Sequence, residues 1–104
     1  MQNSKEIEKN NIIKLIESKE FEKAEKKINL LLEKDPHSTE LYNYLGTVYA
    51  EQNKNDQAIS SYNNSIQKDK NNFKAYNNLG VLMYKLFKFK DAKIYYYEAI
   101  IINP

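Results

Sequence analysis

The chain has 104 residues, of which 29% are charged and 41% are apolar, a composition typical of one folded, soluble domain. The net charge of +2 is too small to indicate a polyanionic partner. All sixteen basic residues are Lys, so no guanidinium is available to grip phosphate or base edges, and we expect no nucleic-acid partner. The absence of Cys excludes disulfides, thiolate nucleophiles and thiolate metal sites.

No targeting or membrane-spanning segment is visible in the sequence. Residues 1–20 carry acidic side chains and lack an apolar run of signal-peptide length. No stretch approaches the roughly 18 apolar residues that cross a bilayer. We therefore expect a cytoplasmic protein that does not contact a membrane.

The first third of the chain has the spacing of two helices. Apolar residues recur at intervals of three and four, first before residue 17 and again after residue 23. These residues are Ile12, Leu15 and Ile16, then Ala24, Ile28, Leu31 and Leu32. Asp35 and Pro36 end the second helix, because the residue before a proline disfavours helical backbone.

The middle third predicts a second pair of helices. Ser38 or Thr39 can cap a helix that ends near Gln52, with Glu40 in its first turn, where a negative charge is favourable. Residues 53–55 are turn-forming, and the next helix begins around Asp56.

The last third repeats this arrangement. One helix is predicted from about Phe73 to Leu86, a turn at Phe87 and Lys88, and another helix from about Lys90 to Ile102. The chain therefore predicts an all-α fold with six helices.

Small residues recur at a fixed interval of 34. Gly46 and Gly80 are 34 residues apart, and Ala24, Ala58 and Ala92 share the same interval. We divide the single domain, residues 1–104, into units of about 5–38, 39–72 and 73–104. We expect Gly46 to lie against Ala58 where the two helices of a unit cross, since a larger side chain would push the backbones apart.

This pattern resembles the tetratricopeptide repeat (TPR) family, a 34-residue helix–turn–helix repeat. In the second unit the matching residues are Tyr42, Leu45, Gly46, Tyr49, Ala58 and Tyr62. In the third unit they are Tyr76, Leu79, Gly80, Ala92, Tyr96, Ala99 and Pro104. Met83 replaces the usual aromatic residue and Lys70 the usual proline. The first unit is degenerate and has Ile12 at the small-residue position.

The resemblance implies a right-handed α-solenoid whose first helices line a concave groove. The family binds peptides or partner proteins, often as a scaffold, so the resemblance implies a non-enzymatic interaction module without cofactors. The groove positions that we expect to contact a ligand are Lys9, Asn43, Tyr44, Lys74, Asn77, Asn78, Tyr84 and Lys85. The amides can pair with the backbone of an extended peptide, and Lys74 and Lys85 can receive an acidic side chain or a terminal carboxylate.

Some family members hold the C-terminus of heat-shock chaperones in a two-lysine carboxylate clamp. Lys9 and Lys74 fall at positions that resemble this clamp. Ile13 and Tyr44 stand where the clamp needs Asn, and Asn78 stands where it needs a base. The sequence therefore favours a groove without the complete clamp, and an ordinary hydrated polar surface is the alternative.

The last helix is apolar almost all round, unlike its counterpart in the second unit. The outward residues are Ile94, Tyr95, Tyr97, Ile101 and Ile102, where the second unit has Ser60, Ser61, Asn63, Gln67 and Lys68. Such a helix is normally covered. Three explanations are open: the chain continues into further repeats, it forms a homodimer, or the helix docks a partner. The domain can also belong to a larger enzyme, with the chemistry elsewhere.

No catalytic or metal-binding arrangement is visible. His37 is the only His and follows Pro36 in a turn, so we expect no metal site and no catalytic residue. A cluster of lysines is interleaved with Phe87 and Phe89 and could contact nucleic acid or a membrane surface. These lysines are Lys85, Lys88, Lys90 and Lys93. The sequence favours a solvated turn in which Phe89 packs inward, as Phe21 does at the equivalent position.

Overall fold

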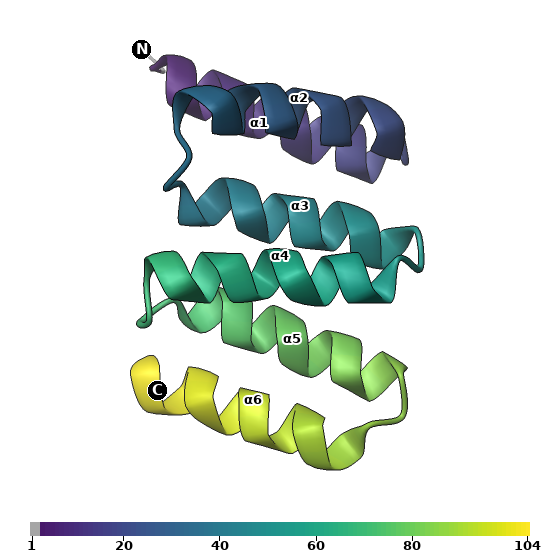
Figure 1. Cartoon of the computed structure of the whole chain (residues 1–104), viewed down its shortest axis with the longest axis vertical. Coiled ribbons are helices and arrows are strands. Elements are labelled where there is room, and N and C mark those ends of the chain that lie inside the picture. Colours follow the sequence, from purple (N-terminus) through teal and green to yellow (C-terminus); the bar gives the residue numbers. More distant parts are fainter. Residues whose placement is uncertain (1–2) are drawn as a thin grey trace.

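The computed structural model describes residues 3–104 and consists of six helices stacked in chain order (Figure 1). These are α1 (Ser4–Glu17), α2 (Phe21–Lys34), α3 (Thr39–Glu51), α4 (Asn55–Lys68), α5 (Phe73–Lys85) and α6 (Phe89–Ile102). The stack measures 40 × 26 × 22 Å, and its two ends are formed by the first helix pair and by α6. The predicted all-α architecture of helix–turn–helix repeats is confirmed, and the expected boundaries agree within about two residues.

First helices begin at side-chain caps. The Ser38 hydroxyl oxygen accepts a hydrogen bond from the Leu41 N–H at 3.2 Å, which confirms Ser38 as the cap of α3. Asn72 caps α5 in the same way, accepting from the Ala75 N–H at 3.3 Å. The second helices of the units have no side-chain cap and begin directly after a tight turn.

That tight turn has one conformation in all three units. Lys19, Asn53 and Phe87 have φ angles of 60°, 61° and 61°, in the left-handed region, and are 34 residues apart. At each turn, the N–H of the residue after the left-handed one donates a hydrogen bond to the carbonyl five residues before it. In the third unit this bond runs from the Lys88 N–H to the Met83 carbonyl at 2.9 Å. This is the Schellman motif that ends many helices. A local backbone feature therefore repeats with the same period as the side chains.

The glycines of the second and third units have the same packing reason. A Cβ atom at Gly46 would lie 2.5 Å from the ring of Tyr62, and one at Gly80 would lie 2.7 Å from the ring of Tyr96. Each glycine therefore makes room for a tyrosine ring from the second helix of its own unit. Tyr62 lies one helical turn beyond Ala58 on α4, so the nearest contact of Gly46 is the tyrosine ring that we expected beside the crossing.

The core is divided into two clusters along the stack. One cluster joins α1, α2 and α3 and includes Ile12, Ile28 and Val48, all fully buried. The other joins α4, α5 and α6 and includes Tyr62 and Leu79. Tyr49 packs against both clusters, so α3 links the two halves of the core.

The first helix pair is more open than the other two. α1 contacts α2 much less closely than α3 contacts α4 or α5 contacts α6. Ile12 and Ile28 occupy the positions that Gly46 and Tyr62 occupy in the second unit, and both are fully buried. Because a branched side chain replaces glycine at the crossing, the two backbones cannot approach as closely.

Candidate functional site

The first helices of the three units present equivalent faces, and α3 contacts α5 directly. Along α3 the predicted groove residues Asn43 and Tyr44 are half-buried. Along α5 the equivalent residues are more accessible: Lys74, Asn77 and Lys85 are exposed and Asn78 is half-buried. The predicted groove residues are therefore partly covered on α3 and more accessible on α5.

The open edge is a single stripe of side chains. Lys74, Asn78, Val81 and Lys85 are spaced three or four residues apart, which places them on one side of α5. Val81 is 39% exposed, although it is apolar and lies mid-helix. Lys85 lies eleven positions after Lys74, so the two lie roughly 16 Å apart along the axis at about 1.5 Å per residue. Neither lysine forms an ion pair within residues 3–104.

Asn43 takes part in a polar network inside the protein. Its amide N–H donates to the Asn72 side-chain oxygen at 3.5 Å. The Asn72 amide donates to the Ser65 hydroxyl at 2.6 Å, and this hydroxyl donates to the Thr39 carbonyl at 2.8 Å. The network joins the start of α3, the end of α4 and the start of α5. Asn43 therefore has a structural role that the sequence analysis missed, because its partners are remote in sequence.

Lys9 is paired across the first two units. Its ammonium group lies 3.3 Å from a carboxylate oxygen of Glu40, and this hydrogen bond raises the pKa of Lys9. Burial raises the pKa of the neighbouring Tyr44 phenol. Because Lys9 already has a carboxylate partner, it is less available to a ligand than Lys74 or Lys85.

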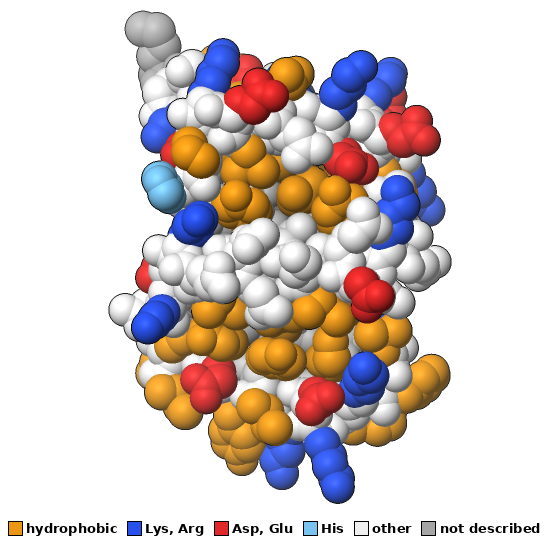
Figure 2. Space-filling model, viewed as in Figure 1, with side chains coloured by type: hydrophobic (Ala, Val, Ile, Leu, Met, Phe, Trp, Pro, Cys, Tyr) orange, Lys and Arg blue, Asp and Glu red, His pale blue; other side chains and the backbone are white. Residues whose placement is uncertain are grey.

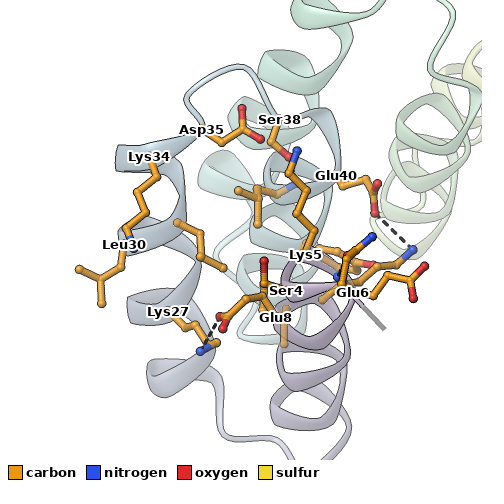
Figure 3. A pocket seen from close by; sticks show the side chains of 16 residues that line it. Ser4, Lys5, Glu6, Glu8, Lys27, Leu30, Lys34, Asp35, Ser38 and Glu40 are labelled. Atoms are coloured by element: carbon orange, nitrogen blue, oxygen red, sulfur yellow. Dashed lines mark hydrogen bonds and ion pairs between the residues drawn. The ribbon is translucent and has the colours of Figure 1, made fainter. Parts of the chain in front are cut away.

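A hollow of about 700 Å³ lies beside this ion pair, between α1, α2 and α3 (Figure 3). Its lining includes the apolar side chains of Ile12, Leu31 and Leu41. A second ion pair, between Lys27 and Glu8 at 2.7 Å, bridges α2 and α1 at its edge. The hollow follows from the open first helix pair.

Tyr84 lies at the boundary between the groove and the last helix. It is 61% exposed, and its ring contacts that of Phe89 edge-on, with the centroids 5.3 Å apart. Phe89 is itself 55% exposed, so the expectation that it packs inward is wrong. Phe21 packs against the first core cluster, which includes α3, but no described helix follows α6 to cover Phe89.

The last helix is exposed over much of its surface. Ile94, Tyr97 and Ile101 are exposed as predicted, whereas Ile102 is half-buried and Tyr95 packs against the core. On the face drawn in Figure 2, hydrophobic side chains lie on both sides of a band over α4 that shows few of them, and those below this band extend to the α6 end of the stack. Ile100 is also exposed and was missed, because its counterparts in α2 and α4, Leu32 and Ile66, pack against the core.

Two family models match the chain, one described as "TPR repeat" over residues 46–86 and one as "Tetratricopeptide repeat" over residues 74–103. The chain belongs to the tetratricopeptide repeat family. TPR domains are generally protein–protein interaction modules and typically not catalytic.

Solved TPR structures share this fold. A crystal structure of MamA matches 85% of this chain and 52% of its own, with 20% identity and a TM-score of 0.77. The match to MamA from Desulfovibrio magneticus RS-1 covers 96% of this chain and 56% of the MamA chain, with 16% identity and a TM-score of 0.82. A third match is the first TPR of Spaghetti (RPAP3), described as bound to the HSP90 peptide SRMEEVD. It covers 94% of this chain and 78% of the RPAP3 chain, with 21% identity and a TM-score of 0.83.

The extent of these similarities is limited. The TPR chain described here spans about half the length of the MamA chains that it matches. No curated protein matches it in sequence. Within residues 3–104, none of the helices combines the length and apolar character needed to cross a bilayer.

Proposed function

We propose that this TPR domain binds an extended acidic peptide in the groove formed by α3 and α5. The observation that supports this most is the stripe on α5, where two lysines without ion-pair partners in residues 3–104 flank the exposed Val81. Lysine ammonium groups attract carboxylates, and a half-exposed apolar side chain between them gains from being covered.

The peptide should have a definite spacing of acidic residues. The two lysines are roughly 16 Å apart along α5. An extended chain advances about 3.3 Å per residue, so two carboxylates about five residues apart can reach both lysines. The exposed Asn77 and the half-buried Asn78 lie between them and can pair with the peptide backbone.

The ligand of the RPAP3 domain suggests one comparison. That peptide, SRMEEVD, has two adjacent Glu residues and a terminal Asp. In this chain Lys9 is already paired with Glu40, and Tyr44 and Ile13 occupy positions where the family clamp has amides. We therefore propose weaker binding of SRMEEVD than of a peptide with acidic residues five apart.

The test uses fluorescence anisotropy with labelled synthetic peptides. Two peptides of equal composition carry their two Glu residues either five residues apart or adjacent, and the first should bind more tightly. Lys74→Glu/Lys85→Glu should lower its affinity at least about tenfold, since attraction becomes repulsion at both ends. The control variant Lys26→Glu/Lys54→Glu changes the net charge by the same amount at positions away from the groove. It should have little effect on the affinity. Equal losses in both double variants would contradict the proposal.

A further inference from the structure

The outer face of α6 is the counterpart of two faces that are covered elsewhere in the molecule. In α2, residues Phe21, Ile28 and Leu32 pack in the cluster that includes α3. In α4, residues Tyr62 and Ile66 pack in the cluster that includes α5. The equivalent residues of α6, 34 positions after those of α4, are Phe89, Tyr96 and Ile100. Tyr96 is half-buried against α5, but no described helix follows α6 to cover the outer side of these residues.

A hollow of about 500 Å³ lies on this face. It is mainly apolar and is lined by Tyr84, Phe89, Ala92, Lys93, Tyr96, Tyr97 and Ile100. Since its counterparts on α2 and α4 hold the helices α3 and α5, the shape of this surface suits a helix. It differs from the peptide groove, which lies on the first helices.

Lys93 makes the hollow more favourable for a negatively charged group. Its counterpart in α2 is Glu25, whose carboxylate accepts a hydrogen bond from the Tyr49 hydroxyl of α3 at 3.1 Å. Its counterpart in α4 is Ile59, which packs in the same apolar cluster as Met83 of α5. Residues 49 and 83 are themselves equivalent. A helix packed on α6 in the same way would place its residue equivalent to 49 and 83 near Lys93. A carboxylate at that position is the complementary group.

The distribution of charge also favours an acidic partner. Residues 73–104 contain five Lys, one Asp and one Glu and carry a net charge of +3, whereas residues 3–72 carry −1. Two copies that met through α6 would bring these positive ends together, which is unfavourable.

A second copy is also a poor occupant through its α1. The α1 residues equivalent to those of α3 that pack in the cluster with α2 are Ile7, Asn10, Asn11, Lys14 and Leu15. Three of them are polar, and all except the half-buried Leu15 are exposed. This face would offer α6 little apolar surface and a second positive charge. Head-to-tail association of identical chains is therefore not favoured.

We propose that the α6 face binds an acidic amphipathic helix of a partner polypeptide. The repeat relation specifies its register. Leu79, Leu82 and Met83 of α5 pack against α4, so the bound helix has apolar residues at positions i and i+3 and an acidic residue at i+4, beside Lys93.

The test is a charge-swap experiment with the full chain. The probes are two helix-constrained peptides based on residues 73–86, both with Lys74→Glu and Lys85→Glu. One of them also has Met83→Glu, and the other has Met83→Lys. The Met83→Glu peptide should bind the wild type about fivefold more tightly than the Met83→Lys peptide, since attraction replaces repulsion at a partly exposed site. Lys93→Glu in the protein should reverse this order.

A matched pair of isoleucine variants locates the binding surface. Ile100 lines the hollow and is 57% exposed, whereas Ile94 is 59% exposed but does not line it. Ile100→Ser should weaken binding of the Met83→Glu peptide, and Ile94→Ser should not. Equal effects of the two variants, or no preference between the peptides, would overturn the proposal. So would the absence of peptide binding combined with binding to vesicles of phosphatidylserine and phosphatidylcholine.

Discussion

Gly46 and Gly80 make the same contact in two different surroundings. Each lies under a tyrosine ring, but Tyr62 is almost fully buried while Tyr96 is half-buried near the end of the stack. The ring of Tyr62 cannot move away from an added methyl group, whereas that of Tyr96 can turn toward solvent.

Alanine substitutions should therefore differ in effect. Gly46→Ala should lower the free energy of unfolding by about 1–2 kcal/mol, because overpacking outweighs the better helix propensity of alanine. Gly80→Ala should be about neutral. Urea unfolding monitored by circular dichroism measures both values. A Gly46→Ala variant as stable as the wild type would show that the Tyr62 ring is not confined.

Tyr62 also couples stability to alkaline pH. Burial raises the pKa of its phenol above the ordinary value of 10.0, and its oxygen lies 3.0 Å from the Thr47 hydroxyl. The folded state therefore binds this proton more tightly than the unfolded state. The resulting stabilisation is complete below about pH 10 and is lost as the pH rises through the raised pKa.

The free energy of unfolding of the wild type should fall as the pH rises above about 10. It should fall less steeply in Tyr62→Phe, which has no phenol to titrate at this position. Some decrease should remain, since burial also raises the pKa values of Tyr44 and Tyr49. Urea unfolding across this range measures both slopes, and parallel slopes would exclude Tyr62 as a source of the pH dependence.

At the scale of the helix pair, the turn residues Asn53 and Phe87 have the same left-handed backbone but different side chains. Asparagine tolerates this conformation better than an aromatic residue does. Phe87 is 80% exposed, and its ring contacts Phe89 at a centroid distance of 6.1 Å, so little burial offsets the backbone cost.

Exchanging the two residue types should have opposite effects. Phe87→Asn should raise the free energy of unfolding by about 0.5–1 kcal/mol, and Asn53→Phe should lower it by about 1 kcal/mol. Thermal unfolding of the two variants beside the wild type provides the comparison. Destabilisation by Phe87→Asn would mean that the phenyl ring contributes more than its exposure indicates.

The open first helix pair depends on Ile12 and Ile28 together. Ile12→Gly alone should cost about 2–4 kcal/mol by leaving a cavity, and Ile28→Tyr alone should overpack the core. The double variant recreates the glycine–tyrosine pair of the second unit. It should recover at least about 1 kcal/mol relative to the sum of the single effects. A double-mutant cycle in urea measures this coupling, and strict additivity would contradict the explanation.

The sequence predicted features that depend on local spacing. The helix boundaries and the Ser38 cap follow from residues near one another in the chain. Contacts between units were harder to predict. The hydrogen bond from Asn43 to Asn72 and the outward position of Phe89 depend on which helix covers which face, and no local pattern specifies that.

At the scale of the whole molecule, two exposed surfaces of residues 3–104 are proposed to bind partners. One is the groove edge on α5, with its two lysines and Val81, and the other is the apolar face of α6 beside Lys93. Tyr84 of α5 borders both surfaces. Lys74 and Lys85 do not line the α6 hollow, and Lys93 and Ile100 lie on α6, so variants are available that change one surface without the other. The two proposals can therefore fail independently.

Peptide binding between α3 and α5 is tested most directly by mapping with nuclear magnetic resonance. The ¹⁵N-labelled chain would be titrated with the peptide that carries two Glu residues five apart, and backbone amide shifts would be followed. The largest changes should occur along α5 between residues 74 and 85 and along the facing part of α3. Changes confined to α6, or spread evenly over all the lysine-bearing helices, would contradict a peptide site in the groove.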